Sequence, residues 1–302
     1  EEDTVQRFLG AEKPRKRVLL FVFRQPAGDV EFTPLTPVPY DWKTEEWNEG
    51  MDTLRYYITN GEMDTISLRI SLDTTVFDTV SFELNREELP QRKKDEEEEQ
   101  ILRLNSNARS GFPYYRKLEL LASYPITEVD LSRFLLVENS DSLAPELEVF
   151  GTARRKLRLT RELQESSNYL LFFPDSVITD VLGRSNDTTQ IRFSTNAYEN
   201  YGLYQLHVSN GSQYKQLIIQ LLTEEGKVVR EELVLGERMI KWDFVVPGKY
   251  MIKAIADIHR NGKWDTGNYL KKQQPEPIVF YPDIIEIREG WSFEEDWFVE
   301  FR

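Results

Sequence analysis

Short segments in which hydrophobic and polar residues alternate, separated by turn residues, run through this sequence. One such segment places Leu54, Tyr56 and Ile58 on one face, and the same pattern recurs at 66–70 and 250–256. Alternation with a period of two is typical of β-strands that bury one face. Turn dipeptides separate these segments, among them Asn60-Gly61, Asn210-Gly211, Glu225-Gly226, Pro247-Gly248 and Asn261-Gly262. The pattern predicts an all-β protein of tandem β-sandwich domains.

Continuous hydrophobic runs mark the strands expected to lie at the centres of sheets. Val18–Phe23 and Leu170–Phe173 contain no polar residue, and Leu217–Leu222 is interrupted only by Gln220. A strand buried on both faces has this composition, because neither face meets water. We therefore predict that these three segments are central strands.

Two breaks in the strand pattern divide the chain into three sandwich-sized units. The segment Pro90–Gln100 has no apolar residue, and its basic residues precede a run of acidic ones. We interpret it as a solvated linker, with an acidic ligand-binding tract as the alternative. A second break falls near Ser194–Gly202, where polar residues follow a strand. The predicted units are a β-sandwich-like unit at 1–89, the linker at 90–100, an Ig-like domain at 101–195 and a prealbumin-like sandwich at 196–302.

Composition excludes several classes of function. The 302 residues include 38 Lys and Arg against 52 Asp and Glu, a net charge of −14. This charge argues against nucleic-acid binding, which needs a basic patch. The absence of cysteine excludes disulfides, thiol nucleophiles and cysteine-ligated zinc. The two histidines, His207 and His259, are far apart in sequence, so we expect no histidine cluster.

The sequence shows no catalytic constellation, and we therefore predict that the protein is not an enzyme. His207 lies on a strand that is expected to turn Tyr204, Leu206 and Val208 to the core, so its ring should face the opposite side. Carboxylates are abundant, but no pair stands out as the two close groups that a hydrolase would need. No apolar run approaches the roughly 18–20 residues of a membrane span.

The middle unit resembles the bacterial Ig-like domain of S-layer-type surface proteins. The residues that carry this resemblance are Pro125, Ile126 and Asp130 before one strand, then Tyr169, Leu171, Pro174, Asp180, Gly183, Asn186 and Asp187 before the last strand. Their expected roles are structural. Asp180 and Gly183 suit a turn with a positive φ, and Tyr169 and Leu171 point to the same face of a strand.

The third unit resembles a transthyretin-like, or carboxypeptidase-regulatory-like, prealbumin sandwich. The motif is Pro247-Gly248 with Tyr250 two residues later, followed by an alternating apolar strand. Together with the C-terminal segment from Tyr281 to Trp297, it is similar to Gram-negative envelope lipoproteins with Ig-like domains. That resemblance implies a location in the periplasm or at the outer-membrane surface. It also implies that the lipid-bearing cysteine and a first Ig-like domain precede Glu1, so membrane association would come only from an upstream anchor.

The loop after residue 256 is the one candidate metal site. Asp257, Asn261 and Asp265 occupy its first, fifth and ninth positions, and Gly262 its sixth, as at the start of an EF-hand calcium loop. Two positions depart from that pattern, because His259 is third and Asn268 is twelfth. We name Asp257, Asn261, Lys263 and Asp265 as candidate calcium ligands. The alternative is structural: the two aspartates accept backbone N–H bonds around an Asn-Gly turn. No other cofactor is expected.

Exposed aromatic rings would offer a second kind of site. Trp42 and Trp47 lie in the first unit, and Trp291 and Trp297 lie near the C-terminus. Indole rings stack on sugars and peptides when exposed, and fill cores or domain junctions when buried. The sequence therefore predicts a non-catalytic cell-envelope scaffold or interaction protein with a protein or glycan partner. The alternative is a carbohydrate- or peptide-binding accessory module assisted by calcium.

Overall fold

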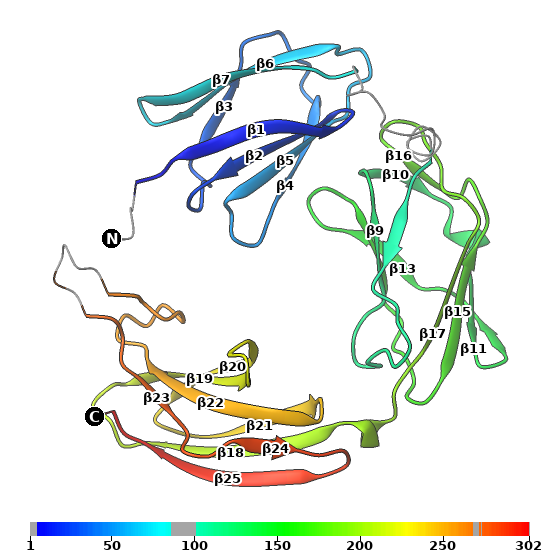
Figure 1. Cartoon of the computed structure of the whole chain (residues 1–302). Helices are drawn as coiled ribbons and strands as arrows, with labels where there is room; N and C mark the ends of the chain where they lie inside the picture. Colours follow the sequence, from blue (N-terminus) through cyan, green and yellow to red (C-terminus); the bar gives the residue numbers. More distant parts are fainter. Residues whose placement is uncertain (1–4, 86–100, 268–271, 273, 302) are drawn as a thin grey trace. The chain divides into compact units, whose positions relative to one another are not determined.

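In a computed structural model, the regular elements of the described residues are β-strands and two single-turn 3-10 segments, η1 (Leu131–Arg133) and η2 (Tyr198–Asn200) (Figure 1). The structure describes residues 5–85, 101–267, 272 and 274–301. The chain divides into two compact units, with the boundary between Thr195 and Asn196. The predicted linker at 90–100 lies outside the described residues, and the division into three units stays a prediction. Among the described residues, no helix is long and apolar enough to span a membrane.

The unit up to Thr195 contains two large hydrophobic cores and a smaller cluster of Val18, Tyr57, Tyr124 and Ala153. The first core lies between a sheet of order β1-β2-β5-β4 and a sheet of order β3-β6-β7. Phe21, Tyr56 and Leu68 are among its fully buried residues. The strands are β1 (Phe8–Arg15), β2 (Val18–Phe23), β3 (Glu31–Pro34), β4 (Lys43–Trp47), β5 (Thr53–Ile58), β6 (Thr65–Leu72) and β7 (Thr75–Glu83).

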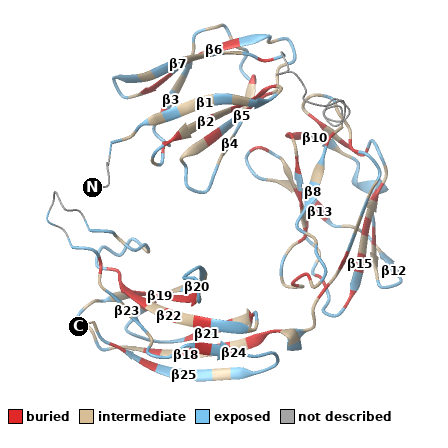
Figure 2. Cartoon of the chain, viewed as in Figure 1, coloured by how far each residue is buried: buried red, intermediate tan, exposed pale blue. Residues whose placement is uncertain are grey.

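The second core of this unit lies between a sheet of order β12-β11-β15-β17 and a sheet of order β13-β14-β9-β8, and β10 pairs with β16. Leu136, Leu157 and Leu171 are fully buried in it. Figure 2 shows buried stretches of its strands, such as those of β15, in red. Its strands are β8 (Leu104–Ser106), β9 (Glu119–Ala122), β10 (Ile126–Val129), β11 (Leu135–Glu138), β12 (Asp141–Leu143), β13 (Leu147–Phe150), β14 (Lys156–Leu159), β15 (Asn168–Phe173), β16 (Ile178–Asp180) and β17 (Thr189–Ser194).

The unit from Asn196 packs a sheet of order β21-β18-β25 against one of order β20-β19-β22-β23, with β24 also paired to β22. Strands β18 and β25 run parallel, and the other pairs in this unit are antiparallel. The strands are β18 (Gly202–Asn210), β19 (Gln216–Thr223), β20 (Val228–Leu235), β21 (Glu237–Val245), β22 (Gly248–Ala256), β23 (Ile278–Phe280), β24 (Ile285–Ile287) and β25 (Ser292–Val299).

The predicted all-β sandwich architecture is confirmed, and the three continuous hydrophobic runs form strands β2, β15 and β19. Each has a neighbour on both sides in its sheet. Leu217–Leu222 is buried on both faces, as predicted. In β15, by contrast, Leu170 and Phe172 are only half-buried, because one face of that sheet is more open than the continuous apolar composition implies.

Candidate functional site

The outer face of the β20-β19-β22-β23 sheet carries the loop that the sequence singles out. Directly opposed residues in antiparallel strands share a face, so Leu233, Ile218, Ile255 and Ile278 form one row across the four strands. Ile218 and Ile255 are fully buried although they point away from the core between the two sheets. Asp257 is the next residue on this face after Ile255. It follows the end of β22 and lies beside Gln216.

Asp257 fixes the first half of the loop. Its carboxylate is buried and accepts hydrogen bonds from the backbone N–H groups of Asn261 (3.1 Å) and Gly262 (2.9 Å) and from Nε2 of Gln216 (2.6 Å). Gly262 has φ of +71°, a conformation that glycine adopts without strain. These contacts are the ones that the structural alternative predicts for Asp257.

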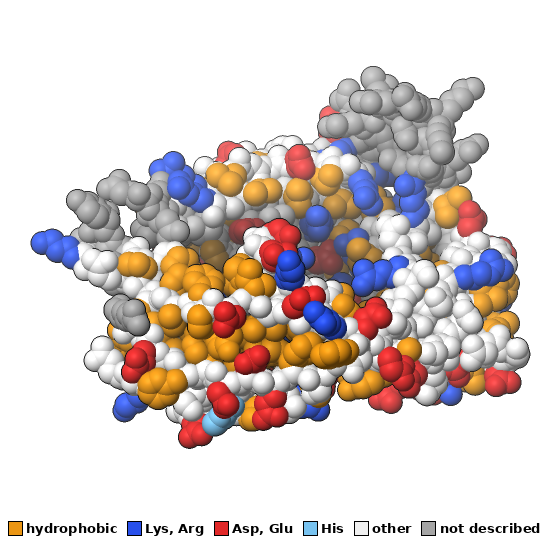
Figure 3. All heavy atoms as spheres, turned by 60° about the horizontal axis from the view of Figure 1, so that its bottom comes forward, with side chains coloured by type: hydrophobic (Ala, Val, Ile, Leu, Met, Phe, Trp, Pro, Cys, Tyr) orange, Lys and Arg blue, Asp and Glu red, His pale blue; other side chains and the backbone are white. Residues whose placement is uncertain are grey.

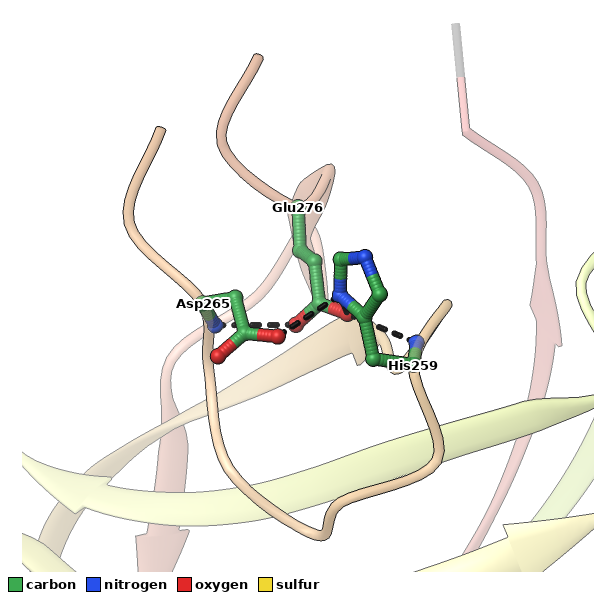
Figure 4. Close-up of side chains that lie close together, drawn as sticks. All are labelled: His259, Asp265 and Glu276. Atoms are coloured by element: carbon green, nitrogen blue, oxygen red, sulfur yellow. Dashed lines mark hydrogen bonds and ion pairs between the residues drawn. The ribbon is translucent and has the colours of Figure 1, made fainter. Parts of the chain in front are cut away.

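Glu276, just before β23, holds two stretches of the loop in place (Figure 4). Its carboxylate is buried, and Oε1 accepts the backbone N–H of Ile258 at 2.7 Å and that of His259 at 3.3 Å. Oε2 accepts the backbone N–H of Asp265 at 3.0 Å. Two stretches of the loop that are separated in sequence are thereby held to one carboxylate.

His259, Asp265 and Glu276 together form the candidate metal centre. Nδ1 of His259 lies 2.7 Å from Oδ2 of Asp265 and 3.5 Å from Oε1 of Glu276. One ligand atom from each of the three lies within 4.8 Å of the others. One imidazole and two carboxylates suit zinc and neighbouring transition metals, whereas calcium prefers oxygen ligands alone.

Each of the four predicted calcium ligands takes part in hydrogen bonds of the loop through its side chain or backbone. The Asp257 oxygens face Gln216 and the backbone, and Asn261 donates through Nδ2 to both oxygens of Asp265 at 3.0 Å. The Lys263 backbone N–H donates to Asn261 Oδ1. Only Asp265 belongs to the candidate metal centre. In the sequence, His259 departs from the calcium pattern, and the prolines on both sides of Glu276 do not indicate that this residue returns to the loop.

The four predicted ligand-binding tryptophans lie in different environments. Trp42 and Trp297 are buried in the cores of their units. Trp47 is half-buried and packs on Phe23 with ring centroids 6.3 Å apart. Trp291 is 57% exposed and stacks on Phe293. A ligand could therefore reach Trp291 directly, and it could also reach the exposed Trp264, which the sequence interpretation did not single out.

Exposed hydrophobic side chains concentrate in the unit from Asn196. Of 22 large hydrophobic residues that are exposed among the described residues, 13 belong to this unit, although it is about a third of the chain. On the face of the molecule shown in Figure 3, hydrophobic side chains gather with acidic ones between them. On the sheet described above, we call the following set the outer apolar face: Leu233, Leu235, Ile258, Trp264, Ile278 and Phe280.

His207 lies on the opposite sheet of the same unit, turned away from the core as predicted. Its Nδ1 lies 3.0 Å from Oδ1 of Asp296, and its Nε2 lies 2.8 Å from Oε1 of Glu237. The hydrogen bond to Asp296 and then that to Glu237 raise the pKa of His207 above its ordinary value.

A raised folded-state pKa has a defined effect on stability. The imidazolium stabilises the fold fully below the unfolded-state pKa of about 6.5, and this contribution is lost as pH rises through the folded-state pKa. We predict that an NMR titration of the Cε1 proton gives His207 a pKa above 6.5, and that Asp296→Asn lowers it. His259, the other histidine, serves as the internal control. An unchanged His207 pKa in Asp296→Asn would contradict the assignment.

No family model matches the sequence, and no curated protein matches it. Among solved structures, the N-terminal part of the bacterial S-layer protein SbsC is similar with 12% identity and a TM-score of 0.29, over 55% of this chain and 43% of that one. Alpha-2-macroglobulin from Escherichia coli, spanning domains MG0-NIE-MG1, is similar with 11% identity and a TM-score of 0.28, over 95% of this chain and 98% of that one.

A third similar structure is SGBP-B of the Bacteroides ovatus mixed-linkage glucan utilization locus, in complex with a mixed-linkage heptasaccharide. It has 9% identity and a TM-score of 0.25, over 90% of this chain and 69% of that one. Of the SbsC fragment named above, the chain spans less than half the length. At these TM-scores, the likenesses establish neither a family nor a function. The observed architecture by itself makes the chain an all-β protein of tandem β-sandwich domains.

Proposed function

We propose that this chain is a non-catalytic interaction protein of the bacterial cell envelope, which binds a protein partner through the outer apolar face. The observation that carries the proposal is the exposure of six large hydrophobic side chains on one sheet face and its loop. The envelope location, and lipid anchoring through a segment outside this chain, rest on the sequence resemblance to envelope lipoproteins alone.

Hydrophobic side chains of the outer apolar face are exposed on both edge strands of the sheet, β20 and β23. Leu233 and Ile278 are each nearly half exposed at the two ends of a row whose middle residues, Ile218 and Ile255, are fully buried. The next row places Gln220 and Lys253 beside Phe280. Contiguous exposed apolar surface on a soluble domain commonly marks an interaction site.

The row of Gln220 and Lys253 holds a buried acceptor without a hydrogen-bond partner among the described residues. Gln220 is buried, and its Nε2 donates to Oε2 of Glu231, but its Oε1 has no hydrogen-bond partner among the described residues. Burial also lowers the pKa of Lys253. An unpaired buried acceptor costs free energy unless a donor reaches it.

Site-specific photocrosslinking in the native host tests the proposal. With a photoreactive amino acid at Ile278 or Phe280, we expect one discrete protein adduct at both positions. A matched probe at Val76, an exposed hydrophobic residue of β7, is expected to give none. A negative charge introduced at the other end of the row, as Leu233→Asp, should abolish the adduct. Adducts of equal yield at Val76, or no adduct at either face position, would reject the proposed surface.

Carbohydrate binding is the second candidate function, and the exposure of Trp264 and Trp291 favours it. Both indole rings are about half exposed, and Arg288 lies over the Trp291 ring at 5.5 Å. Trp264 lies in the loop between β22 and β23, and Trp291 directly precedes β25. Exposed indole rings suit stacking on sugar rings. In the same experiment, crosslinking to polysaccharide instead of protein, with loss of the adduct in Trp264→Ala, would favour this function over the first.

A divalent cation is a further part of the proposal. We propose that His259, Asp265 and Glu276 bind it and thereby fix the loop beside Trp264. The alternative is the calcium site that the sequence predicts, with Asp257, Asn261, Lys263 and Asp265 as ligands. The support is the convergence of one imidazole and two carboxylates, with Glu276 buried. Protons compete with a metal for the imidazole, so affinity should fall in acid.

A further inference from the structure

A pocket in the unit up to Thr195 is lined by positively charged residues, although the chain as a whole is negatively charged. It has a volume of about 410 Å³, and its lining includes four arginines: Arg15, Arg103, Arg155 and Arg184. Of the described residues that line it, none is acidic, whereas the whole chain carries a net charge of −14. A cleft lined by one sign of charge concentrates its field and attracts ions of the opposite sign.

Two of these arginines are held in fixed positions by aromatic rings and carboxylates. The Arg184 guanidinium lies 3.9 Å from the centre of the Tyr124 ring, and its Nε and Nη2 donate to Oδ2 of Asp180. Arg155 lies over the Tyr57 ring at 5.0 Å and donates through Nη1 to Oε2 of Glu46 at 2.5 Å. Arginines fixed in this way lose little conformational freedom when they bind a ligand.

The pocket keeps unused hydrogen-bonding capacity. Arg155 Nε donates to the Ala122 carbonyl, which leaves Nη2 without an acceptor among the described residues. Arg15 is exposed at the pocket and has no described carboxylate partner. Glu46 pairs with Arg155, and Asp180 pairs with Arg184. Guanidinium groups bind planar and tetrahedral oxyanions through paired N–H donors.

We infer that this pocket binds a small polyvalent oxyanion, a ligand carrying two or more carboxylate, sulfate or phosphate groups. Its volume falls in the range of small-molecule sites. The pocket shares no residue with the outer apolar face or with the candidate metal centre. A negative result for the proposed function would therefore not contradict anion binding at this pocket. A negative result for anion binding would likewise not contradict the proposed function.

Isothermal titration of the full chain with citrate, sulfate and acetate at low ionic strength tests the inference. We expect one site that binds citrate more tightly than sulfate and sulfate more tightly than acetate, and that weakens as sodium chloride is added. Arg15→Gln with Arg103→Gln should weaken citrate binding at least tenfold, and Arg15→Gln alone should weaken it less. Arg192→Gln, at an exposed position of β17 outside the pocket, is the matched control and should leave it unchanged.

Two outcomes would overturn the inference. One is equal loss of citrate affinity in Arg192→Gln and in the pocket variants, which would show unspecific charge attraction. The other is that citrate binds only after Glu96–Glu99, which precede Ile101 in the sequence, are replaced by glutamine. That result would indicate that the pocket arginines neutralise the acidic residues of this chain instead of binding a separate anion.

Discussion

Replacing Asn186 with alanine is expected to lower the free energy of unfolding of the residue 101–195 region by about 3 kcal/mol. Asn186 is buried, and its Oδ1 accepts the backbone N–H groups of Val177 (3.1 Å) and Ile178 (2.8 Å). Its Nδ2 donates to the carbonyls of Pro174 and Asp187, both at 2.8 Å. Alanine would leave two backbone donors without an acceptor, each costing about 1–3 kcal/mol when buried.

The measurement should use hydrogen exchange of peptides covering 174–188, together with urea unfolding followed by far-UV circular dichroism. All six tryptophans lie outside 101–195, so indole fluorescence does not report on this region. Asn186→Asp keeps the acceptor but turns a buried carboxylate oxygen toward the Pro174 and Asp187 carbonyls, so it should destabilise at least as much as alanine. Asn105→Ala, at an exposed position, should change stability by less than about 0.5 kcal/mol. Unchanged exchange at Val177 and Ile178 in Asn186→Ala would contradict this account.

The turn that contains Asp180 shows how local sequence signals can predict structure. Gly183 has φ of +73°, and Asp180 accepts the backbone N–H groups of Leu182 and Arg184. Tyr169 and Leu171 are both buried on one face of β15. These predictions succeed because their contacts span only a few residues, so turn chemistry and the period of two are sufficient to fix them.

The candidate site could be predicted only in part, because its contacts join distant residues. Asp257 and the Asn261-Gly262 turn are local, and the sequence indicates both. Glu276 is 17 residues from His259, and it joins the loop only because β23 pairs with β22. The pocket arginines likewise come from strands and loops between Arg15 and Arg184. The periodicity of the sequence does not show which distant residues come together, because this depends on how the strands pair into sheets.

Replacing Glu276 with glutamine is expected to loosen the loop that carries the candidate metal centre. Both carboxylate oxygens accept backbone N–H groups, from Ile258 and His259 at Oε1 and from Asp265 at Oε2. A glutamine has one acceptor oxygen, so its NH₂ group must face at least one of these donors. Each unpaired buried donor costs about 1–3 kcal/mol. We expect faster hydrogen exchange at 258–265, while Glu224→Gln, at an exposed position, should leave it unchanged.

The same variant tests the cation, because removing one charged ligand should remove the stabilisation that binding gives. A cation at about 100 times its Kd stabilises the folded state by about 2.7 kcal/mol, and EDTA should reverse this. We expect zinc to raise the melting temperature of the native protein but not that of Glu276→Gln or His259→Gln. A calcium-dependent rise that persists in His259→Gln would instead favour the oxygen set around Asp257, because calcium does not need the imidazole. If neither ion changes the melting temperature, Asp257 and Glu276 act only as acceptors for the loop backbone, and Trp264 is positioned without a metal.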